Sequence, residues 1–287
     1  MITRKRKITG ITTAAAILFA FAVWAVWGNT TIEVTRTAIV SDRLPESFSG
    51  FRIAHVSDLH NSEFGTDNSY LLQKIREENP DIIVITGDLV DSRRTNTEIA
   101  LKFVNSAMKI APVYYVTGNH EARLDDFHEL EAGLRKAGAV VLRDSVQTIE
   151  KDGERILLLG LDDPRFVLKN DLFDEKRAMI DTKLKNLKPE GNDFSVLLFH
   201  RPELYDVYVD NEIDLVLSGH THGGQIRLPF VGAVVVPDQG LFPKYDAGLF
   251  QSGGTSMVIS RGLGNSLLPI RLNCRYELVI ITLGRQD

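Results

Sequence analysis

The stretch LSGHTHGGQ, residues 217–225, places two histidines on either side of one threonine, with glycines nearby. The chain has only 7 histidines, so two of them in one short loop form a distinctive feature. Glycines carry no Cβ and would let such a loop bring both imidazoles close to a common ligand. His220 and His222 are therefore candidate metal ligands, because neutral imidazole is the commonest metal-binding side chain.

Polar clusters also end several apolar runs elsewhere: SDLH, GDLVD, GNHE, GLDD and FH. In α/β folds, ligands bind beyond the carboxyl ends of the strands, so clusters of this kind converge at one edge. Asp58 and His60 are two residues apart, and in an extended chain both would point to the same side. The candidates gathered in this way are Asp58, His60, Asp88, Asn119, His120, His200, His220 and His222.

Oxygen and nitrogen ligands without a thiolate suit divalent cations, with Mn²⁺ as first choice and Fe, Zn²⁺ or Mg²⁺ as alternatives. Seven of these eight candidates, all except His120, are possible ligands, and they exceed the four of a structural zinc site. They fit a pair of cations about 3.5–4 Å apart, which Asp88 is able to bridge through its carboxylate. Each cluster alone is equally explained as an ordinary strand end or turn. We expect His55, within a strand, and His128, in a polar helix, to be structural.

These residues need a framework of alternating strands and helices, and the hydrophobic pattern predicts one. Strands are expected at 31–40, 51–59, 81–89, 112–120, 140–150, 154–163, 194–200, 213–220 and 275–283. Helices are expected at 68–79, 97–110, 125–138 and 173–187. Several strands are apolar at successive positions, which is typical of a sheet covered on both faces.

The N-terminus predicts a membrane anchor. Residues 1–7 carry four basic side chains and no acid, and an uncharged run of 20 residues follows at 8–27. Such a run spans about 30 Å as a helix. Trp24 and Trp27 lie at its far end, where interfacial aromatics are found, and the basic end indicates a cytoplasmic N-terminus. A cleaved signal peptide and a buried core helix are the alternatives.

We therefore divide the chain into a basic end with a transmembrane anchor (1–28), a linker with a first edge strand (29–50) and a catalytic domain (51–287). The expected location is the cell membrane, with a single span and an extracytoplasmic domain.

Residues 8–287 hold 29 basic and 38 acidic residues, and this acidic balance argues against a nucleic-acid partner. No protein partner is implied. Cys274, the only cysteine, is expected to be a packed small residue.

The ordered motifs DLH, GDLVD, GNHE, FH and GHTH resemble those of the calcineurin-like metallophosphoesterase superfamily. The longer stretches SDLHNSEFG and GHTHGGQIRLP are similar to its bacterial membrane-associated branch, described as phosphodiesterases or UDP-2,3-diacylglucosamine pyrophosphatases. The resemblance implies a four-layer αββα sandwich. It also implies one metal at Asp58, His60, Asp88 and His222, and a second at Asp88, Asn119, His200 and His220.

The resemblance further implies that water activated by the metals attacks phosphorus, with His120 as the catalytic acid or charge stabiliser. Glu121 or Asp91 would orient His120. Arg123, Arg201 and Arg261 are candidate substrate-binding residues because they lie near the motifs. The apolar stretch LPFVGAVVVP, 228–237, is expected to pack in the core, with the entrance for a lipid chain as the alternative.

The expected function is hydrolysis of a phosphodiester or diphosphate bond in a lipid-linked or cell-envelope substrate, of which UDP-2,3-diacylglucosamine is one form. The first alternative is a phosphomonoesterase acting on phosphorylated small molecules or proteins. The second is a non-catalytic scaffold that retains the fold for binding.

Overall fold

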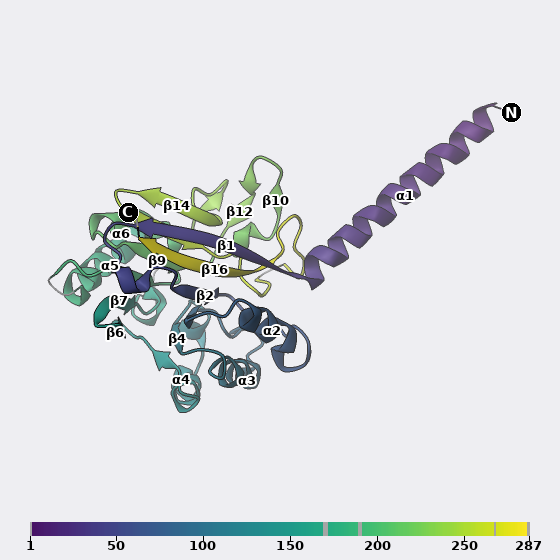
Figure 1. The fold of residues 1–287 in the computed structure, drawn as a ribbon. Helices are drawn as coiled ribbons and strands as arrows, with labels where there is room; N and C mark the ends of the chain where they lie inside the picture. Colours follow the sequence, from purple (N-terminus) through teal and green to yellow (C-terminus); the bar gives the residue numbers. More distant parts are fainter. Residues whose placement is uncertain (1, 169–171, 189–190, 267, 286–287) are drawn as a thin grey trace.

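The computed structural model describes residues 2–168, 172–188, 191–266 and 268–285. One long helix, α1 (Ile2–Thr30), projects from a domain built of two large sheets and shorter helices (Figure 1). Within these described ranges, α1 is the one helix long and apolar enough to cross a membrane, and the domain buries none of its segment Thr12–Thr30. The apolar run predicted at 8–27 thus lies in an exposed helix, which rules out the core-helix alternative.

The first sheet has six strands in the order β1-β16-β2-β3-β4-β5. The strand predicted at 31–40 lies at its edge and pairs in parallel with the last strand of the chain, Ile32 opposite Tyr276. The strands, in sheet order, are β1 (Ile32–Ser41), β16 (Tyr276–Arg285), β2 (Arg52–Val56), β3 (Ile82–Thr86), β4 (Val113–Val116) and β5 (Val140–Val141).

The second sheet also has six strands, in the order β14-β15-β9-β8-β7-β6. Its four central strands are parallel, and antiparallel hairpins form both edges. In sheet order the strands are β14 (Gly248–Ser252), β15 (Thr255–Ile259), β9 (Leu215–Ser218), β8 (Ser195–Leu198), β7 (Glu154–Gly160) and β6 (Ser145–Lys151).

The two sheets pack face to face. Alternate residues of a strand point to opposite faces, so Ile82 and Val84 of β3 face the other sheet while Ile83 and Ile85 face the helices. Every residue of β3 is buried for this reason, which explains its continuous apolar sequence. The inner layer is a single buried cluster that includes Ile53, Val84 and Val116 from the first sheet and Leu158, Val196 and Leu217 from the second.

Helices cover both outer faces. α2 (Ser69–Glu77), α3 (Thr97–Ala107) and α4 (Phe127–Lys136) pack on the first sheet. α5 (Phe173–Leu187) and α6 (Tyr205–Asp210) pack on the second. The side chains of Asn96 and Asp126 cap α3 and α4 by accepting backbone hydrogen bonds from the first turn. The four-layer αββα sandwich predicted from the sequence is therefore confirmed.

Several strands end earlier than the apolar runs suggest. β2 ends at Val56, β3 at Thr86 and β4 at Val116, so the polar motifs that follow lie in loops. The short helix α6 was absent from the sequence prediction. Its six residues are too few to show the 3.6-residue period clearly.

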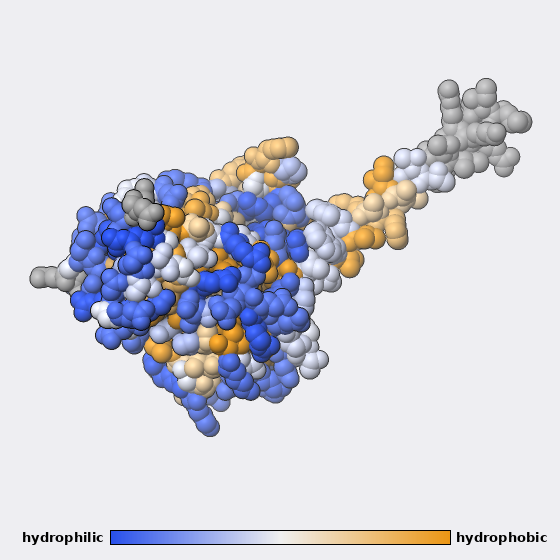
Figure 2. Space-filling view, viewed as in Figure 1, coloured by the Kyte–Doolittle hydropathy of each residue, from blue (hydrophilic) through white to orange (hydrophobic). Residues whose placement is uncertain are grey.

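The segment 228–237 does not pack mainly in the core. It forms parts of two small hairpins, β10 (Arg227–Leu228) with β11 (Gly232–Ala233) and β12 (Val235–Val236) with β13 (Gly240–Leu241). Ala233 and Val236 are buried, but most of the other apolar side chains are exposed. Figure 2 shows a hydrophobic projection where Figure 1 places β10. The expectation of core packing was wrong because two-residue strands at the edge of the domain leave one side of each hairpin uncovered.

Candidate metal centre

Five loops meet at the carboxyl ends of strands from both sheets. Asp58 and His60 follow β2, and Asp88 follows β3. The loop after β4 supplies Asn119 and His120. From the second sheet, the loops after β8 and β9 supply His200, His220 and His222. All eight residues are buried, and their shared groups of neighbouring ligand atoms and their common cavity show that the structure brings the predicted set together.

Five of these residues adopt backbone conformations with positive φ: Asp58 (52°), His60 (46°), Asp88 (50°), His220 (70°) and His222 (51°). Residues other than glycine seldom do so, and each instance costs about 1–3 kcal/mol. The extended geometry expected for Asp58 and His60 was therefore wrong, since both lie in a tight loop. Such strain clusters where the surrounding structure must aim side chains at a ligand.

Glycines permit the loops to approach one another. A Cβ on Gly219 would collide with Oγ of Ser57 and with Oδ2 of Asp58. A Cβ on Gly118 would collide with Oδ1 of Asp88. Any larger residue at these two positions would push the carboxylates out of place, which explains the glycine before His220 and the glycine before Asn119.

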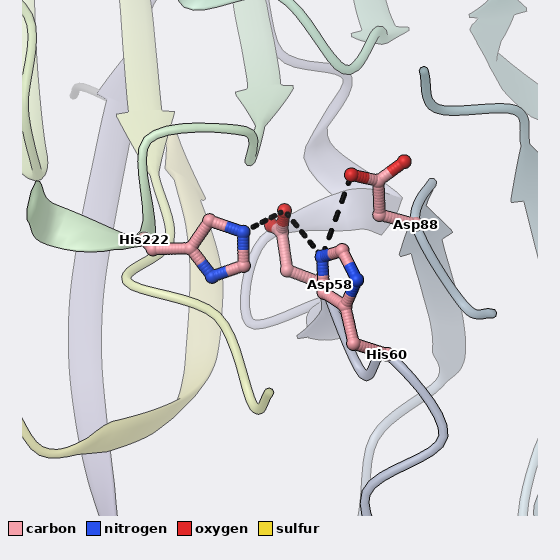
Figure 3. A group of neighbouring side chains, drawn as sticks. All are labelled: Asp58, His60, Asp88 and His222. Atoms are coloured by element: carbon pink, nitrogen blue, oxygen red, sulfur yellow. Dashed lines mark ion pairs between the residues drawn. The ribbon is translucent and has the colours of Figure 1, made fainter. Parts of the chain in front are cut away.

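The first group of side chains consists of Asp58, His60, Asp88 and His222, whose ligand atoms lie within 4.8 Å of one another (Figure 3). Nε2 of His222 lies 3.3 Å from Oδ1 of Asp58. Nε2 of His60 lies 3.9 Å from the same oxygen and 3.4 Å from Oδ2 of Asp88. The two imidazoles and two carboxylates therefore converge on one small volume.

The second group consists of Asp88, His200 and His220. Nε2 of His200 lies 3.3 Å from Oδ2 of Asp88 and 3.2 Å from Nδ1 of His220. The same Oδ2 atom of Asp88 therefore belongs to both groups. Oδ1 of Asp88 is occupied otherwise, since it accepts a hydrogen bond of 2.7 Å from the backbone N–H of His120.

Hydrogen bonds fix the orientation of three imidazoles. Nδ1 of His200 lies 2.7 Å from the carbonyl of Thr86, and Nδ1 of His222 lies 3.2 Å from that of Gly264. Because carbonyl oxygens only accept, Nδ1 carries the proton when these rings are neutral, and Nε2 is then the nitrogen available to a metal. His220 is reversed: its Nε2 lies 2.8 Å from Oδ2 of Asp238, and its Nδ1 faces Nε2 of His200. In each ring the free nitrogen faces the centre, as metal-binding histidines require.

Two observations show that the donor set fits a divalent cation. Oδ1 of Asn119 and both ring nitrogens of His60 are buried without a hydrogen-bond partner among the described residues, and such groups are costly to leave unsatisfied. Burial lowers the pKa of His200, but the charges of Asp88 and Asp58 outweigh this effect and raise it to about 10. The carboxylates of Asp58 and Asp88 thus place negative charge at the centre, which a bound cation would neutralise.

His120 lies beside the first group, with its ring centroid 4.5 Å from that of His60. The backbone N–H of Ser92 donates a 3.0 Å hydrogen bond to Nδ1 of His120, so the ring proton is on Nε2. Burial lowers the pKa of His120 to about 4. The ring is therefore neutral near pH 7 and offers an N–H donor.

The carboxylate of Glu121 holds the loops that carry Asp88 and Asn119. Oε2 accepts hydrogen bonds from the backbone N–H groups of Gly118 (2.7 Å) and Asp88 (2.8 Å), and Oε1 from that of Leu89 (2.8 Å). Glu121 thus orients the two loops and not the ring of His120. Nδ1 of His120 lies instead 3.4 Å from Oδ1 of Asp91.

A cavity of about 200 Å³ opens onto the centre. Arg123 lines it, as the sequence suggested, together with Arg93 and Arg165, which were not among the predicted residues. Nothing in the local sequence distinguishes these two arginines from surface residues. Arginine is well suited to bind phosphate oxygens through paired N–H groups.

The structure does not support the substrate-binding role predicted for Arg201 and Arg261. Arg201 is fully buried, and its guanidinium donates to both carboxylate oxygens of Asp163, at 2.6 and 3.1 Å. Arg261 donates to Glu277 at 2.7 Å and to Glu33 at 3.1 Å. Both guanidinium groups are thus committed to carboxylates of the protein and support the fold.

The remaining candidates lie outside the centre. His55 is buried, and its Nε2 lies 2.7 Å from Oγ1 of Thr86. His128 is exposed on α4. Cys274 is buried, with its Sγ 3.3 Å from the carbonyl of His222. All three positions agree with the structural roles expected for them.

Comparison with known proteins places this geometry in a family. Residues 51–224 match the family model of the calcineurin-like phosphoesterases. This match covers more than half of the chain, and the chain therefore belongs to the calcineurin-like phosphoesterase family. Membership and the buried His/Asp cluster together define it as a metal-dependent phosphoesterase with the dimetal site typical of the family.

Two bacterial relatives extend over most of the chain. The uncharacterized metallophosphoesterase YkuE of Bacillus subtilis (strain 168) is 33% identical over 260 residues, which cover 88% of this chain and 85% of YkuE. The phosphodiesterase YaeI of Escherichia coli (strain K12) is 30% identical over 291 residues, which cover 99% of this chain and 100% of YaeI.

A solved structure, TT1561 of Thermus thermophilus, has the same fold. It aligns with a TM-score of 0.52 at 13% sequence identity and covers 75% of this chain and 91% of that one. The family is thus confirmed, while similarity to UDP-2,3-diacylglucosamine pyrophosphatases stays a prediction.

Proposed function

We propose that the protein is a membrane-anchored phosphodiesterase that acts through two divalent cations. The observation that carries the proposal is the position of Asp88 Oδ2, 3.4 Å from Nε2 of His60 and 3.3 Å from Nε2 of His200. One carboxylate oxygen shared by two sets of imidazoles is the arrangement expected of a bridging ligand. The similarity to YaeI, which is named a phosphodiesterase, supports cleavage of a diester.

In this proposal, one cation takes Asp58, His60, Asp88 and His222, and the other takes Asp88, Asn119, His200 and His220. Nitrogen and oxygen donors favour Mn²⁺, and Fe, Zn²⁺ and Mg²⁺ are the alternatives. Asn119 supplies the neutral oxygen that is otherwise buried without a partner. The rings of His200, His220 and His222 are already oriented, so cation binding needs release of a proton from His200 but no reorientation of these rings.

When bound, the two cations would supply activation of the attacking water and neutralisation of the charge that develops on the phosphoryl oxygens. The water oxygen would bond to phosphorus as the bond from phosphorus to the leaving oxygen breaks, and one water proton would end on the leaving oxygen while the other stays on the phosphate or passes to solvent. His120 donates a hydrogen bond from Nε2–H to the leaving oxygen and stabilises its charge. Arg123 binds a phosphate oxygen and orients the ester in the cavity.

The proposal also places the enzyme at the membrane, with α1 as an uncleaved span, a cytoplasmic N-terminus and an extracytoplasmic domain. The basic residues before the apolar run support this orientation. A test is to introduce Glu150→Cys at the exposed position of the edge strand β6 and to treat intact cells with a maleimide that cannot cross membranes. Labelling of intact cells supports the orientation, whereas labelling only after lysis contradicts it. The buried Cys274 provides the unlabelled background.

The activity is tested with the full-length chain purified in detergent. The protein is stripped of metal with a chelator, Mn²⁺, Zn²⁺ or Mg²⁺ is added back, and rates on a small phosphodiester and a small phosphomonoester are compared. Metal-dependent cleavage that favours the diester supports the proposal. Preference for the monoester would instead indicate a phosphomonoesterase. Absence of turnover with two metals bound would favour the non-catalytic scaffold.

A further inference from the structure

An apolar pocket of about 400 Å³ lies beside the metal centre. Its apolar walls are Val235, Val236, Pro237 and Leu268. His222, Pro237 and Ser266 line both this pocket and the cavity at the metal centre, so the two spaces adjoin. We call this space the apolar pocket. A substrate with its phosphate at the metals would have an apolar surface available directly next to it.

Exposed apolar side chains extend from the apolar pocket across two hairpins. Phe230 and Val231 form the tip of the β10–β11 hairpin, and Leu241 and Phe242 lie at the β12–β13 hairpin, all strongly exposed. The hairpins form one surface, because the backbone N–H of Val234 donates to Ile226 and that of Phe242 donates to Val234. We call the residues Leu228, Phe230, Val231, Leu241 and Phe242 the apolar rim. An exposed apolar surface of this kind marks a site of interaction with an apolar partner.

Hydrogen bonds tie the apolar rim to the end of α1. Asn29 exchanges two hydrogen bonds with the backbone of Arg271, of 2.7 and 2.8 Å. The next residue, Leu272, accepts a hydrogen bond of 3.0 Å from the backbone N–H of Arg227, which begins β10. The hairpin of Phe230 therefore stands beside the point where the candidate span enters the domain. A bilayer that surrounds α1 would meet the apolar rim at its surface.

We infer that the apolar pocket binds the hydrocarbon chain of a membrane lipid whose phosphodiester group lies at the metal centre. This inference rests on the proposed phosphodiesterase function and names its substrate class. The apolar rim contacts the bilayer, and the lipid passes from there into the apolar pocket. Burial of the chain beside the phosphate gives the enzyme binding energy that a small diester cannot provide.

The test uses the full-length protein with two added Mn²⁺ and a matched series of p-nitrophenyl alkyl phosphates. The methyl, octyl and hexadecyl esters share the reacting phosphate and the leaving group and differ only in chain length. We expect kcat/KM for the octyl ester to exceed that for the methyl ester at least tenfold. A ratio near one overturns the inference, while failure to cleave any ester with any metal overturns the proposed function itself.

Two matched variants test whether the apolar pocket causes the dependence of kcat/KM on alkyl chain length. Leu268 lines the apolar pocket, whereas Leu249 of strand β14 does not, and the two are similarly exposed, at 42% and 41%. Leu268→Gln is expected to lower the octyl-to-methyl ratio at least threefold, and Leu249→Gln is the control for a polar change on the surface. Equal octyl-to-methyl ratios in the two variants would contradict the binding of the hydrocarbon chain in this pocket.

The source of the lipid is tested by comparing the hexadecyl ester in nanodiscs with the dispersed octyl ester in solution. Phe230→Ser is expected to lower the rate in nanodiscs relative to that in solution at least fivefold, because the rim loses its contact with the bilayer. An unchanged ratio would overturn the role of the bilayer and indicate a dispersed amphiphile instead.

Discussion

Oδ2 of Asp238 lies 2.8 Å from Nε2 of His220, and the same carboxylate pairs with the guanidinium of Arg201. Arg201 is held in turn by Asp163. Asp238 lies in the turn between β12 and β13, next to Pro237 of the apolar pocket. One turn thus both orients a candidate metal ligand and forms a wall of the neighbouring pocket.

Removal of this carboxylate is expected to weaken metal binding. Asp238→Ala frees the ring of His220 to rotate, and loss of such a partner typically lowers metal affinity about 10–100-fold. Arg201 keeps its bonds to Asp163, so the fold should persist. Calorimetric titration of the metal-free protein with Mn²⁺ measures the effect. Asp193→Ala, at an exposed ion pair, is the control, and equal affinities in the two variants would contradict the role of Asp238.

His120→Ala should retain both cations and lose turnover. The ring donates to the leaving oxygen but is not a proposed ligand, and loss of such a donor costs on the order of 10²-fold in kcat. The loss should be greater for an alkyl leaving group than for p-nitrophenolate, which needs less stabilisation. Metal content and kcat are measured together, with the exposed His128→Ala as control. Full activity of His120→Ala on the alkyl ester would refute this role.

The two arginines near the motifs should respond differently to the same change. Arg123→Gln removes a charged group from the cavity and should raise KM roughly tenfold, the usual effect of losing one charge-assisted hydrogen bond. Arg261→Gln should lower thermal stability instead, because it leaves Glu277 without its partner. Steady-state kinetics and thermal unfolding of both variants separate the roles. An increase in KM only in the Arg261 variant would reverse the assignment.

The pair of Glu277 and Arg261 predicts a pH dependence of stability. Burial raises the pKa of Glu277, but the hydrogen bond and charge of Arg261 outweigh this and lower it. The pair therefore stabilises the fold above the unfolded pKa of about 4.3, and the contribution disappears as the pH falls through the lower folded value.

Glu277→Gln should accordingly be destabilised at pH 7 by about 2 kcal/mol, because the guanidinium of Arg261 loses its buried charged partner and keeps only the more exposed Glu33. The difference from the wild type should shrink below about pH 4, where the carboxylate of Glu277 begins to take up its proton in the unfolded chain while the folded protein still binds none. Thermal unfolding followed by circular dichroism across this range measures both effects. A difference that is constant with pH would show that the charge of Glu277 is irrelevant to stability.

The sequence pattern predicted the alternation of strands and helices and the convergence of the motifs, because both depend on local signals, whereas the four-layer arrangement was implied by the family resemblance. The apolar run of β3 and the polar residues after it are visible without a structure. The burial of Arg201 was not predictable, since its partners Asp163 and Asp238 lie 38 and 37 residues away in the sequence. For the same reason, no local pattern in the turn around Asp238 indicated that it faces His220.

For the stretch that contains Phe230, core packing was the favoured expectation, and the entrance for a lipid chain was only the alternative. An apolar stretch is ordinarily buried, and the sequence does not show that two short hairpins leave it uncovered. The positive φ values of Asp58 and His60 depend on contacts with other loops, such as the hydrogen bonds from the backbone of His220 to Asp58. Patterns with a period of two or 3.6 residues carry no information about such contacts.

The most direct test of the account is the number of Mn²⁺ ions bound per chain in the wild type and in Asp88→Asn, measured by mass spectrometry of the metal together with diester hydrolysis. We expect two ions in the wild type. Asp88→Asn should bind at most one ion tightly and lose on the order of 10³-fold in activity, because the oxygen shared by both groups loses its charge. Two tightly bound ions and undiminished hydrolysis in Asp88→Asn would contradict a bridged pair of cations.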